Sequence, residues 1–289
     1  MLIAIKLKLA VVAGFLAAPA MMHALAPATS VANTDFVEIS PAAFSYRMAG
    51  DFSRAGRPVE GPHATTRLPA KLRIMKRQVT VAEYRRCIEA GACPRVAFAD
   101  ARPNVPMVGV SWQDAEAYAA WMRQTTGLNY RLPTDEEWTF AAAESARDEV
   151  APLVDPSDPA QAWIARYEAE SARAAAVVLA PQPVGSFGEN SNGLLDVGGN
   201  VWEWTETCFI RATLDGGSLR VTNTNCGVRV VQGAHRTYMT DFIRDPRTGG
   251  CAAGVPPANL GFRLVVDTEV PSWLKMVDTV ASTLHGRRL

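Results

Sequence analysis

The chain has 289 residues, of which 48% are hydrophobic and 20% charged, ordinary values for a globular protein with a sizeable core. Lysine plus arginine and aspartate plus glutamate both number 29, so the formal net charge is zero. A neutral chain is not expected to bind nucleic acid through bulk basic charge, and this composition argues against a disordered or fibrous protein.

The first 26 residues have the layout of a secretory signal peptide. Lys6 and Lys8 precede an apolar run over 9–22, and Ala24-Leu-Ala26 gives a small-x-small cleavage pattern. An uncleaved anchor is the alternative, but the run is shorter than the roughly 20 residues that a spanning helix needs. We therefore expect residues 1–26 to be removed, no membrane insertion of the mature chain, and a periplasmic or secreted location.

Residue patterns in the first half of the chain predict alternating strands and helices. Strands are expected over 36–46 and 71–79, with a Gly-, Pro- and Arg-rich loop over 49–70 between them. Helices are expected from Thr80 to Gly91, from Ser111 to Gly127, and from Thr134 through Ala142. Thr80 with Glu83, and Thr134 with Glu137, have the spacing of capping boxes.

The second half of the chain has a different residue pattern. An Ala-rich stretch over 160–178 looks helical, and after residue 181 short strands are expected over 228–232 and 261–266 between long loops. The tail over 271–287 has helical apolar spacing, which predicts an amphipathic helix that packs back on the domain. The simplest interpretation is one domain of mixed α and β structure.

Five cysteines are present, and an exported protein can pair them. Cys87 and Cys93 flank a short turn and are expected to form a local disulfide. Cys208, Cys226 and Cys251 compete for a second one. We favour Cys208 with Cys226, because each lies next to an expected short strand, although the sequence does not settle the choice.

The segment over 190–204 has the highest density of candidate functional residues in the chain. Its glycines allow turns, and Asp196 and Glu203 can place two carboxylates around backbone carbonyls, a hard-oxygen arrangement that suits Ca²⁺. The alternative is a structural turn in which Asp196 and Asn200 bond backbone amides and the two tryptophans lie in the core. Because the histidines are scattered, a zinc or non-haem iron site is not expected.

Arg131 lies just before the third expected helix. It can be interpreted as an anion clamp or as a structural ion-pair partner of Glu136 or Glu137. We favour the structural role.

Five motifs in order resemble the formylglycine-generating enzyme family, also called the sulfatase-modifying factor domain. They are VTVAEY over 79–84, VPMVGVSW over 105–112, YRLPTDEEW over 130–138, NGLLDVGGNVWEW over 192–204, and NLGFR over 259–263. The resemblance covers about 36–266. It implies an α+β fold of the variant C-type lectin type, low in regular secondary structure. It also implies a calcium site formed by Asp196, the carbonyls of Gly199 and Val201, and Glu203.

The resemblance fails at the centre of the family's chemistry. Active members use two copper-binding cysteines just after a Gly-Gly-Ser turn, and here the corresponding positions fall near Tyr238 and Ile243. Cu(I) needs soft ligands, so no copper is expected. The groove would instead present a different set of side chains, and these are His235, Arg236, Tyr238, Asp241 and Arg244.

Two functions follow as expectations. The first is a non-copper accessory or maturation factor that binds a periplasmic partner, since the chain resembles family members encoded beside nitrite reductases. The second is an oxidoreductase-like enzyme with an altered site acting on a peptide or siderophore-type substrate, with His235, Tyr238 or Asp241 as acid or base. Formylglycine generation itself is disfavoured.

Overall fold

The computed structural model describes residues 35–96, 100–147, 180–241 and 258–267, together with Ile164 and Glu168. The expected signal peptide, most of the Ala-rich stretch, Arg244, Cys251 and the expected C-terminal helix lie outside the described residues. No helix in the described ranges is both long and apolar enough to cross a membrane.

Three sheets frame the described structure. One has four strands in the order β1 (Phe36–Ile39), β6 (Leu72–Met75), β12 (Val265–Asp267) and β7 (Asn129–Arg131). A second follows the order β10 (Thr237–Thr240), β9 (Ser218–Gln232), β8 (Trp202–Asp215), β3 (Asp51–Arg54) and β4 (Arg57–Val59), and β11 (Leu260–Gly261) also pairs with β8. The third is the pair β2 (Ala43–Arg47) and β5 (His63–Arg67).

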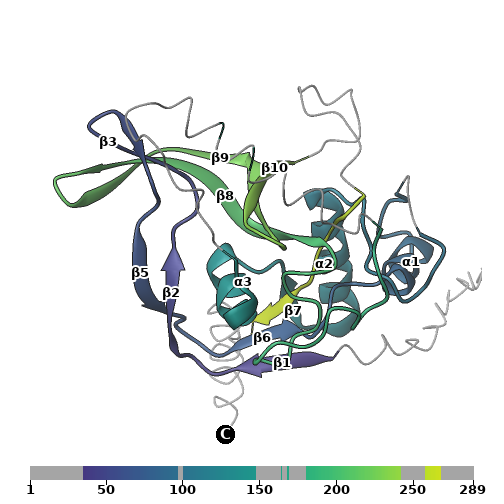
Figure 1. The fold of residues 1–289 in the computed structure, drawn as a ribbon. Coiled ribbons are helices and arrows are strands. Elements are labelled where there is room, and N and C mark those ends of the chain that lie inside the picture. The colour runs from purple at the N-terminus through teal and green to yellow at the C-terminus, as the bar shows by residue number, and fades with distance from the viewer. Residues whose placement is uncertain are drawn as a thin grey trace, which may run out of the picture.

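The helices of the described structure pack on the sheets and on one another. They are α1 (Val81–Glu89), α2 (Trp112–Thr126) and α3 (Asp135–Ala142), the last followed by the short 3-10 helix η1 (Ala143–Ser145). In Figure 1 the long β8–β9 ribbon curves above α3 and ends beside α2, and β1 and β6 of the four-stranded sheet lie below α3. This mixed architecture, with few helices and much irregular chain, confirms the predicted fold class.

Capping side chains account for where the helices begin. Both predicted capping boxes are present, and Ser111 with Asp114 forms a third at the start of α2. Each box satisfies two backbone amides that a helix start would otherwise leave unpaired. Gly127, with φ of 73°, ends α2 in the left-handed conformation that glycine adopts without strain.

Two predictions about the strands were wrong. The expected loop over 49–70 contains β3, β4 and β5, and the short strand expected over 228–232 is only the end of β9, which has 15 residues and pairs with the 14-residue β8. The first ten residues of β9 are exposed, so they lack the hydropathy alternation that marks a half-buried strand. The available signal was Gly216-Gly217, a two-residue glycine turn typical of a hairpin.

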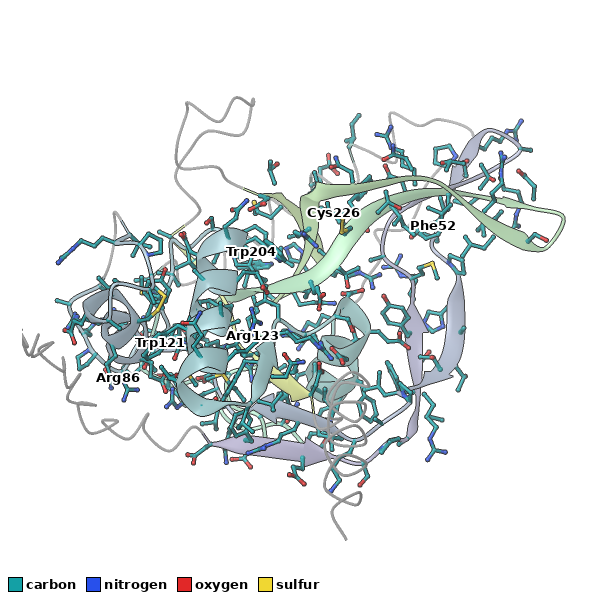
Figure 2. All side chains as sticks on the ribbon, turned by 180° about the vertical axis from the view of Figure 1, so that it is seen from behind. Phe52, Arg86, Trp121, Arg123, Trp204 and Cys226 are labelled. Carbon is teal, nitrogen blue, oxygen red and sulfur yellow. A yellow bond between two sulfur atoms is a disulfide. The ribbon has the colours of Figure 1, made fainter. Side chains whose placement is uncertain are left out.

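The main core lies among α1, α2 and the inner end of the β8–β9 ribbon. Trp204, Tyr84, Tyr118 and Phe262 are almost fully buried there, and the rings of Tyr84 and Tyr118 stack at 5.8 Å. Figure 2 shows Trp204 at the inner end of the ribbon. A second core cluster, which includes Ile74, Leu194 and Phe140, joins α3 to β6.

Two disulfides are present in the described chain. Cys87–Cys93 links the end of α1 to the turn after it, and Cys208–Cys226 links β8 to β9. The Cys87–Cys93 prediction and the favoured second pairing are both confirmed.

Candidate functional site

The candidate site is the wall formed by β10 and its flanking residues, here called the β10 wall. It comprises His235 and Arg236 before the strand, Tyr238 within it, and Asp241 directly after it. Four of the five predicted groove residues therefore lie along one edge strand of the large sheet. The fifth, Arg244, lies outside the described residues.

Tyr238 is fixed against the β3 segment. Its hydroxyl oxygen accepts a hydrogen bond from the Gly50 backbone amide at 2.7 Å, and its ring meets Phe209 edge-on at 5.1 Å. Burial raises the pKa of its phenol, so the hydroxyl stays protonated at neutral pH. The ring is still 36% exposed, which leaves an aromatic surface available to a ligand.

Arg236 is not free to clamp a ligand. It is buried, and it donates to the Arg47 carbonyl at 2.6 Å and to the Asp135 carboxylate at 3.2 Å. Its charge therefore compensates an internal carboxylate. The structure assigns Arg236 to holding the β10 wall against α3 and β2.

Asp135 is the centre of that buried cluster and was missed by sequence reasoning. Its side chain is fully buried and accepts hydrogen bonds from Tyr46, Gln232 and Arg236. Burial raises the pKa of its carboxyl, and the charge of Arg236 opposes that effect. An aspartate in the first turn of a helix looks like an ordinary dipole partner, so the sequence carried no signal for this role.

His235 lies over Trp202. The two rings meet edge-on with centroids 5.4 Å apart, and His235 Nδ1 is 3.2 Å from the Arg236 carbonyl. Gly233, two residues earlier, passes so close to Trp202 that a Cβ would lie 3.0 Å from its Cα. Packing on Trp202 therefore sets the position of the turn that carries His235.

Asp241 is the residue in the β10 wall with the most perturbed acidity. Burial raises its pKa to about 6, with Arg229 opposing the shift. Gln113 of α2 donates to Oδ2, whereas Oδ1 is buried without a hydrogen-bond partner. A carboxyl with a pKa near 6 changes its protonation state close to neutral pH, which makes Asp241 a candidate acid or base.

The predicted calcium residues have other partners. Both oxygens of Glu203 accept from Arg263, and Gln78 and Trp138 donate to them at 2.7 and 2.8 Å. The Asp196 carboxylate accepts the backbone amides of residues 185 and 187 at 2.7 and 2.8 Å. No group of three or more His, Cys, Asp or Glu side chains suited to a metal occurs in the described ranges.

The donor set therefore does not fit the predicted cage of Asp196, Gly199, Val201 and Glu203. Glu203 would have to share its oxygens with a guanidinium, whose positive charge repels a cation. Asp196 instead fits the structural-turn alternative that its sequence also allowed, because its carboxylate bonds backbone amides. We derive no chemistry through calcium.

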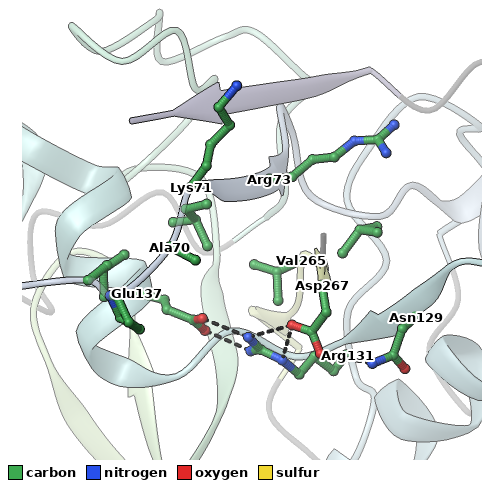
Figure 3. A pocket seen from close by; sticks show the side chains of 12 residues that line it. Ala70, Lys71, Arg73, Asn129, Arg131, Glu137, Val265 and Asp267 are labelled. Atoms are coloured by element: carbon green, nitrogen blue, oxygen red, sulfur yellow. Dashed lines mark hydrogen bonds and ion pairs between the residues drawn. The ribbon is translucent and has the colours of Figure 1, made fainter. Parts of the chain in front are cut away.

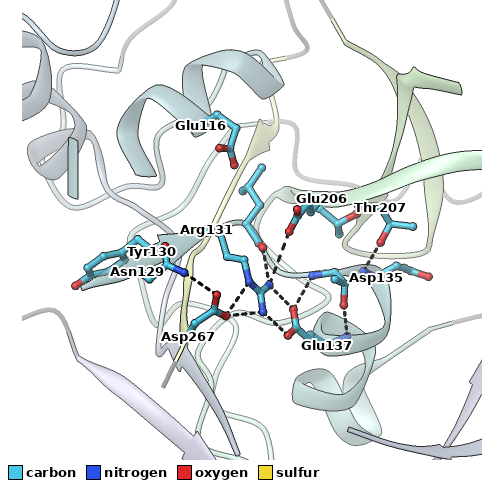
Figure 4. A network of polar contacts seen from close by, with 12 residues as sticks. Glu116, Asn129, Tyr130, Arg131, Asp135, Glu137, Glu206, Thr207 and Asp267 are labelled. Atoms are coloured by element: carbon cyan, nitrogen blue, oxygen red, sulfur yellow. Dashed lines mark hydrogen bonds and ion pairs between the residues drawn. The ribbon is translucent and has the colours of Figure 1, made fainter. Parts of the chain in front are cut away.

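Arg131 takes the favoured structural role. Its guanidinium forms two hydrogen bonds of 2.7 Å to Glu137 and lies 2.8 Å from Asp267, which joins α3 to β12 (Figure 4). Glu206 lies farther away, at 3.9 Å. With two carboxylates against it, Arg131 has no charge left over for an external anion.

A pocket of about 400 Å³ opens beside the same network, on the four-stranded sheet. Figure 3 shows Lys71 and Arg73 on one side and the Arg131 ion pairs on the other. Its polar groups are engaged, because Lys71 pairs with Glu38 and the Arg73 guanidinium lies over the Phe36 ring. The pocket is lined by Arg131, and none of the predicted groove residues or predicted calcium residues lines it.

Comparisons with known proteins identify the family and support the fold. The family model for the sulfatase-modifying factor enzyme 1-like domain matches residues 23–268. The "Inactive C-alpha-formylglycine-generating enzyme 2" of Bos taurus is 33% identical over 169 residues, covering 54% of this chain and 53% of that protein. The "Formylglycine-generating enzyme" of Streptomyces coelicolor is 32% identical over 186 residues, covering 59% and 55%.

The chain thus spans about half the length of the curated relatives it matches. Among solved structures, PvdO from Pseudomonas aeruginosa superposes with a TM-score of 0.50 at 20% identity, covering 80% of this chain and 94% of that one. At that identity the similarity supports the fold alone.

Proposed function

The chain belongs to the sulfatase-modifying factor enzyme 1-like domain family, and from that premise we propose that it is an accessory protein that binds a partner instead of oxidising a cysteine. The partner is a periplasmic protein or peptide, such as a nitrite reductase that it helps to mature. The proposal includes export of the chain. Two disulfides are consistent with an oxidising compartment.

The observation that carries the proposal is the lack of a cysteine pair that could bind copper. No cysteine occurs between Cys226 and Cys251, where the resemblance requires a copper-binding pair. Cys226 is bonded to Cys208, so it is not available as a thiolate ligand. The curated description of the Bos taurus relative as inactive shows that the name of this family also covers proteins without the activity.

The β10 wall is the proposed contact surface. Tyr238 offers a partly exposed ring, and Asp241, which is itself half-buried, follows at the end of the same strand. An aromatic anchor beside a polar group is typical of the residues that dominate protein interfaces.

One observation favours a second candidate function, an enzyme with altered chemistry. The pKa of Asp241, raised to about 6, suits a general acid or base that works near neutral pH. In that case the substrate is a peptide or a siderophore-type molecule, and Asp241 moves the proton.

The decisive experiment combines two measurements on the purified chain. The first incubates it with Cu(I) and a sulfatase-motif peptide, and we expect no aldehyde by mass spectrometry. The second measures binding to the purified nitrite reductase of the same organism by calorimetry, for wild type, Tyr238→Ala, Arg244→Ala and the control Lys71→Ala.

We expect binding that the first two substitutions weaken at least about tenfold and the control leaves unchanged. Lys71 is a matched control because it lies by β6, where it makes only an exposed ion pair. Aldehyde formation above background would overturn the accessory role. Lack of binding to the reductase would exclude that partner.

A further inference from the structure

The Cys208–Cys226 disulfide spans a break in the β8–β9 ladder. Phe209 pairs with Asn225 and the adjacent Cys208 pairs with Arg229, so residues 226–228 of β9 have no partner on β8. The disulfide therefore closes a bulge instead of joining two residues that face one another. Breaking it would leave the ladder hydrogen bonds on both sides of the bulge in place.

The two cysteines of the Cys208–Cys226 disulfide differ in solvent exposure. Cys226, labelled near the middle of the ribbon in Figure 2, is exposed, whereas Cys208 is only partly exposed. The other disulfide differs from it, because Cys87 and Cys93 are 0% and 7% exposed. Cys226 is therefore the more accessible of these two cysteines to an external thiol, and it does not belong to the buried core.

The positively charged guanidinium of Arg229 lies next to the sulfur of Cys208. The Arg229 guanidinium donates to Cys208 Sγ at 3.2 Å, and it stacks on the Trp112 ring at 3.9 Å. The guanidinium also donates to the backbone carbonyl of Glu206 at 2.6 Å, and its Nε is buried without a hydrogen-bond partner. No carboxylate in the described ranges forms an ion pair with it.

That charge interacts differently with the two redox states. A disulfide sulfur is a weak, neutral acceptor, whereas a Cys208 thiolate would form a charge-assisted hydrogen bond with Arg229. A nearby guanidinium lowers a thiol pKa, and a thiol of low pKa is the better leaving group in disulfide exchange. Stabilising the thiolate also makes the disulfide easier to reduce.

We propose that Cys208–Cys226 is a thiol–disulfide exchange site that takes an external dithiol, with Cys226 as the attacked sulfur and Cys208 as the leaving thiolate held by Arg229. The attacking thiolate bonds Cys226 Sγ, the bond between the cysteines breaks, and its electron pair goes to Cys208. The second thiol of the dithiol gives up its proton and attacks the mixed disulfide, which releases Cys226 as a thiol. The dithiol is oxidised to a disulfide, and the protein gains two electrons.

The exchange would act on the β10 wall through the bulge. The backbone amide of Asp241 donates to the carbonyl of Gly227, the residue after Cys226, at 2.8 Å. Reduction therefore removes the covalent link between β8 and the bulge residue next to the one that anchors Asp241. The exchange chemistry itself does not depend on the accessory role proposed above.

The test uses full-length protein in which Cys251 is replaced by Ser, so that no internal thiol competes. Dithiothreitol is added for a series of times, thiols are blocked with iodoacetamide, and each disulfide is followed by peptide mapping. We expect Cys208–Cys226 to open at least about tenfold faster than the buried Cys87–Cys93. With glutathione in place of dithiothreitol, the mixed disulfide should form on Cys226.

Arg229→Gln isolates the role of the charge. It should slow the opening of Cys208–Cys226 and raise the pH at which the reduced Cys208 is alkylated, with circular dichroism showing that the variant is folded. Arg229→Lys should restore part of both effects. Arg211→Gln is the control, because it removes an exposed arginine of β8 that forms an ion pair with Asp51.

Three results would overturn the proposal. They are equal opening rates for the two disulfides, a glutathione adduct on Cys208, and an unchanged rate and alkylation profile in Arg229→Gln. A fall in rate in Arg211→Gln as large as that in Arg229→Gln would also contradict it.

Discussion

Glu203 and Arg263 form a two-pronged ion pair inside the protein, with N–O distances of 2.6 and 2.7 Å and side chains no more than 1% exposed. Arg263 also donates to the Leu195 carbonyl at 3.0 Å, so one guanidinium joins the chain before the loop to the strand after it. The pair thereby fixes both ends of the loop over 195–203.

Removing one member of this pair should destabilise the protein strongly. We expect Arg263→Met to lower the free energy of unfolding by about 3–5 kcal/mol, because it leaves a buried carboxylate without its compensating charge. Urea unfolding measures the effect. Lys71→Met breaks the exposed pair with Glu38 and should cost less than about 1 kcal/mol. Equal losses would contradict the assignment.

A chelator tests whether the loop over 195–203 binds calcium, which the sequence predicts and the side-chain contacts in the structure disfavour. The two carboxylates already have protein partners, so we expect EDTA to leave the melting temperature unchanged. An ion bound only to the folded state would stabilise it, and removing the ion would lower the melting temperature. A clear drop, with calcium found by elemental analysis, would restore the cage predicted from the sequence.

The sequence predicted those features that depend on local chemistry. Thr80–Glu83 and Thr134–Glu137 are capping boxes because the required side chains lie three residues apart, a distance that one helical turn fixes. Cys87 and Cys93 are six residues apart and pair across the end of the same helix.

Features that depend on distant contacts could not be predicted from the residues alone. Asp135 meets Tyr46 and Gln232, which lie 89 and 97 residues away in the chain. Likewise, nothing near Arg263 in the sequence indicates that it would engage the Glu203 carboxylate. The exposed first ten residues of β9 were missed because pairing with β8, and not burial of one face, holds them in place.

Gly233 should tolerate no side chain. A Cβ there would lie 2.9 to 3.0 Å from atoms of Trp202, including its backbone Cα. Gly233→Ala must therefore displace Trp202 or the turn that carries His235, and we expect a loss of about 1–3 kcal/mol in urea unfolding. Gly216→Asn is the control. Its φ of 59° suits asparagine and its Cβ would meet no atom, so it should be neutral.

The raised pKa of Asp241 predicts how the stability of the protein depends on pH. Its pKa is raised from 3.8 in the unfolded chain to about 6 in the folded protein, chiefly by burial. Between these values the folded state binds more protons than the unfolded state, so this group's contribution to stability is largest below about pH 4 and is lost as the pH rises through 6. We expect Asp241→Asn to remove that dependence and to change stability little at pH 4.

Carboxyl-carbon NMR of the labelled protein can follow the titration of Asp241 directly. Arg229 is the charge that lowers the pKa of Asp241, opposing the effect of burial. Arg229→Gln should therefore move its midpoint upward, and Arg211→Gln should leave it in place. A midpoint near 4 in the wild-type protein would contradict the burial that the structure shows, and it would remove the reason to consider Asp241 as an acid or base.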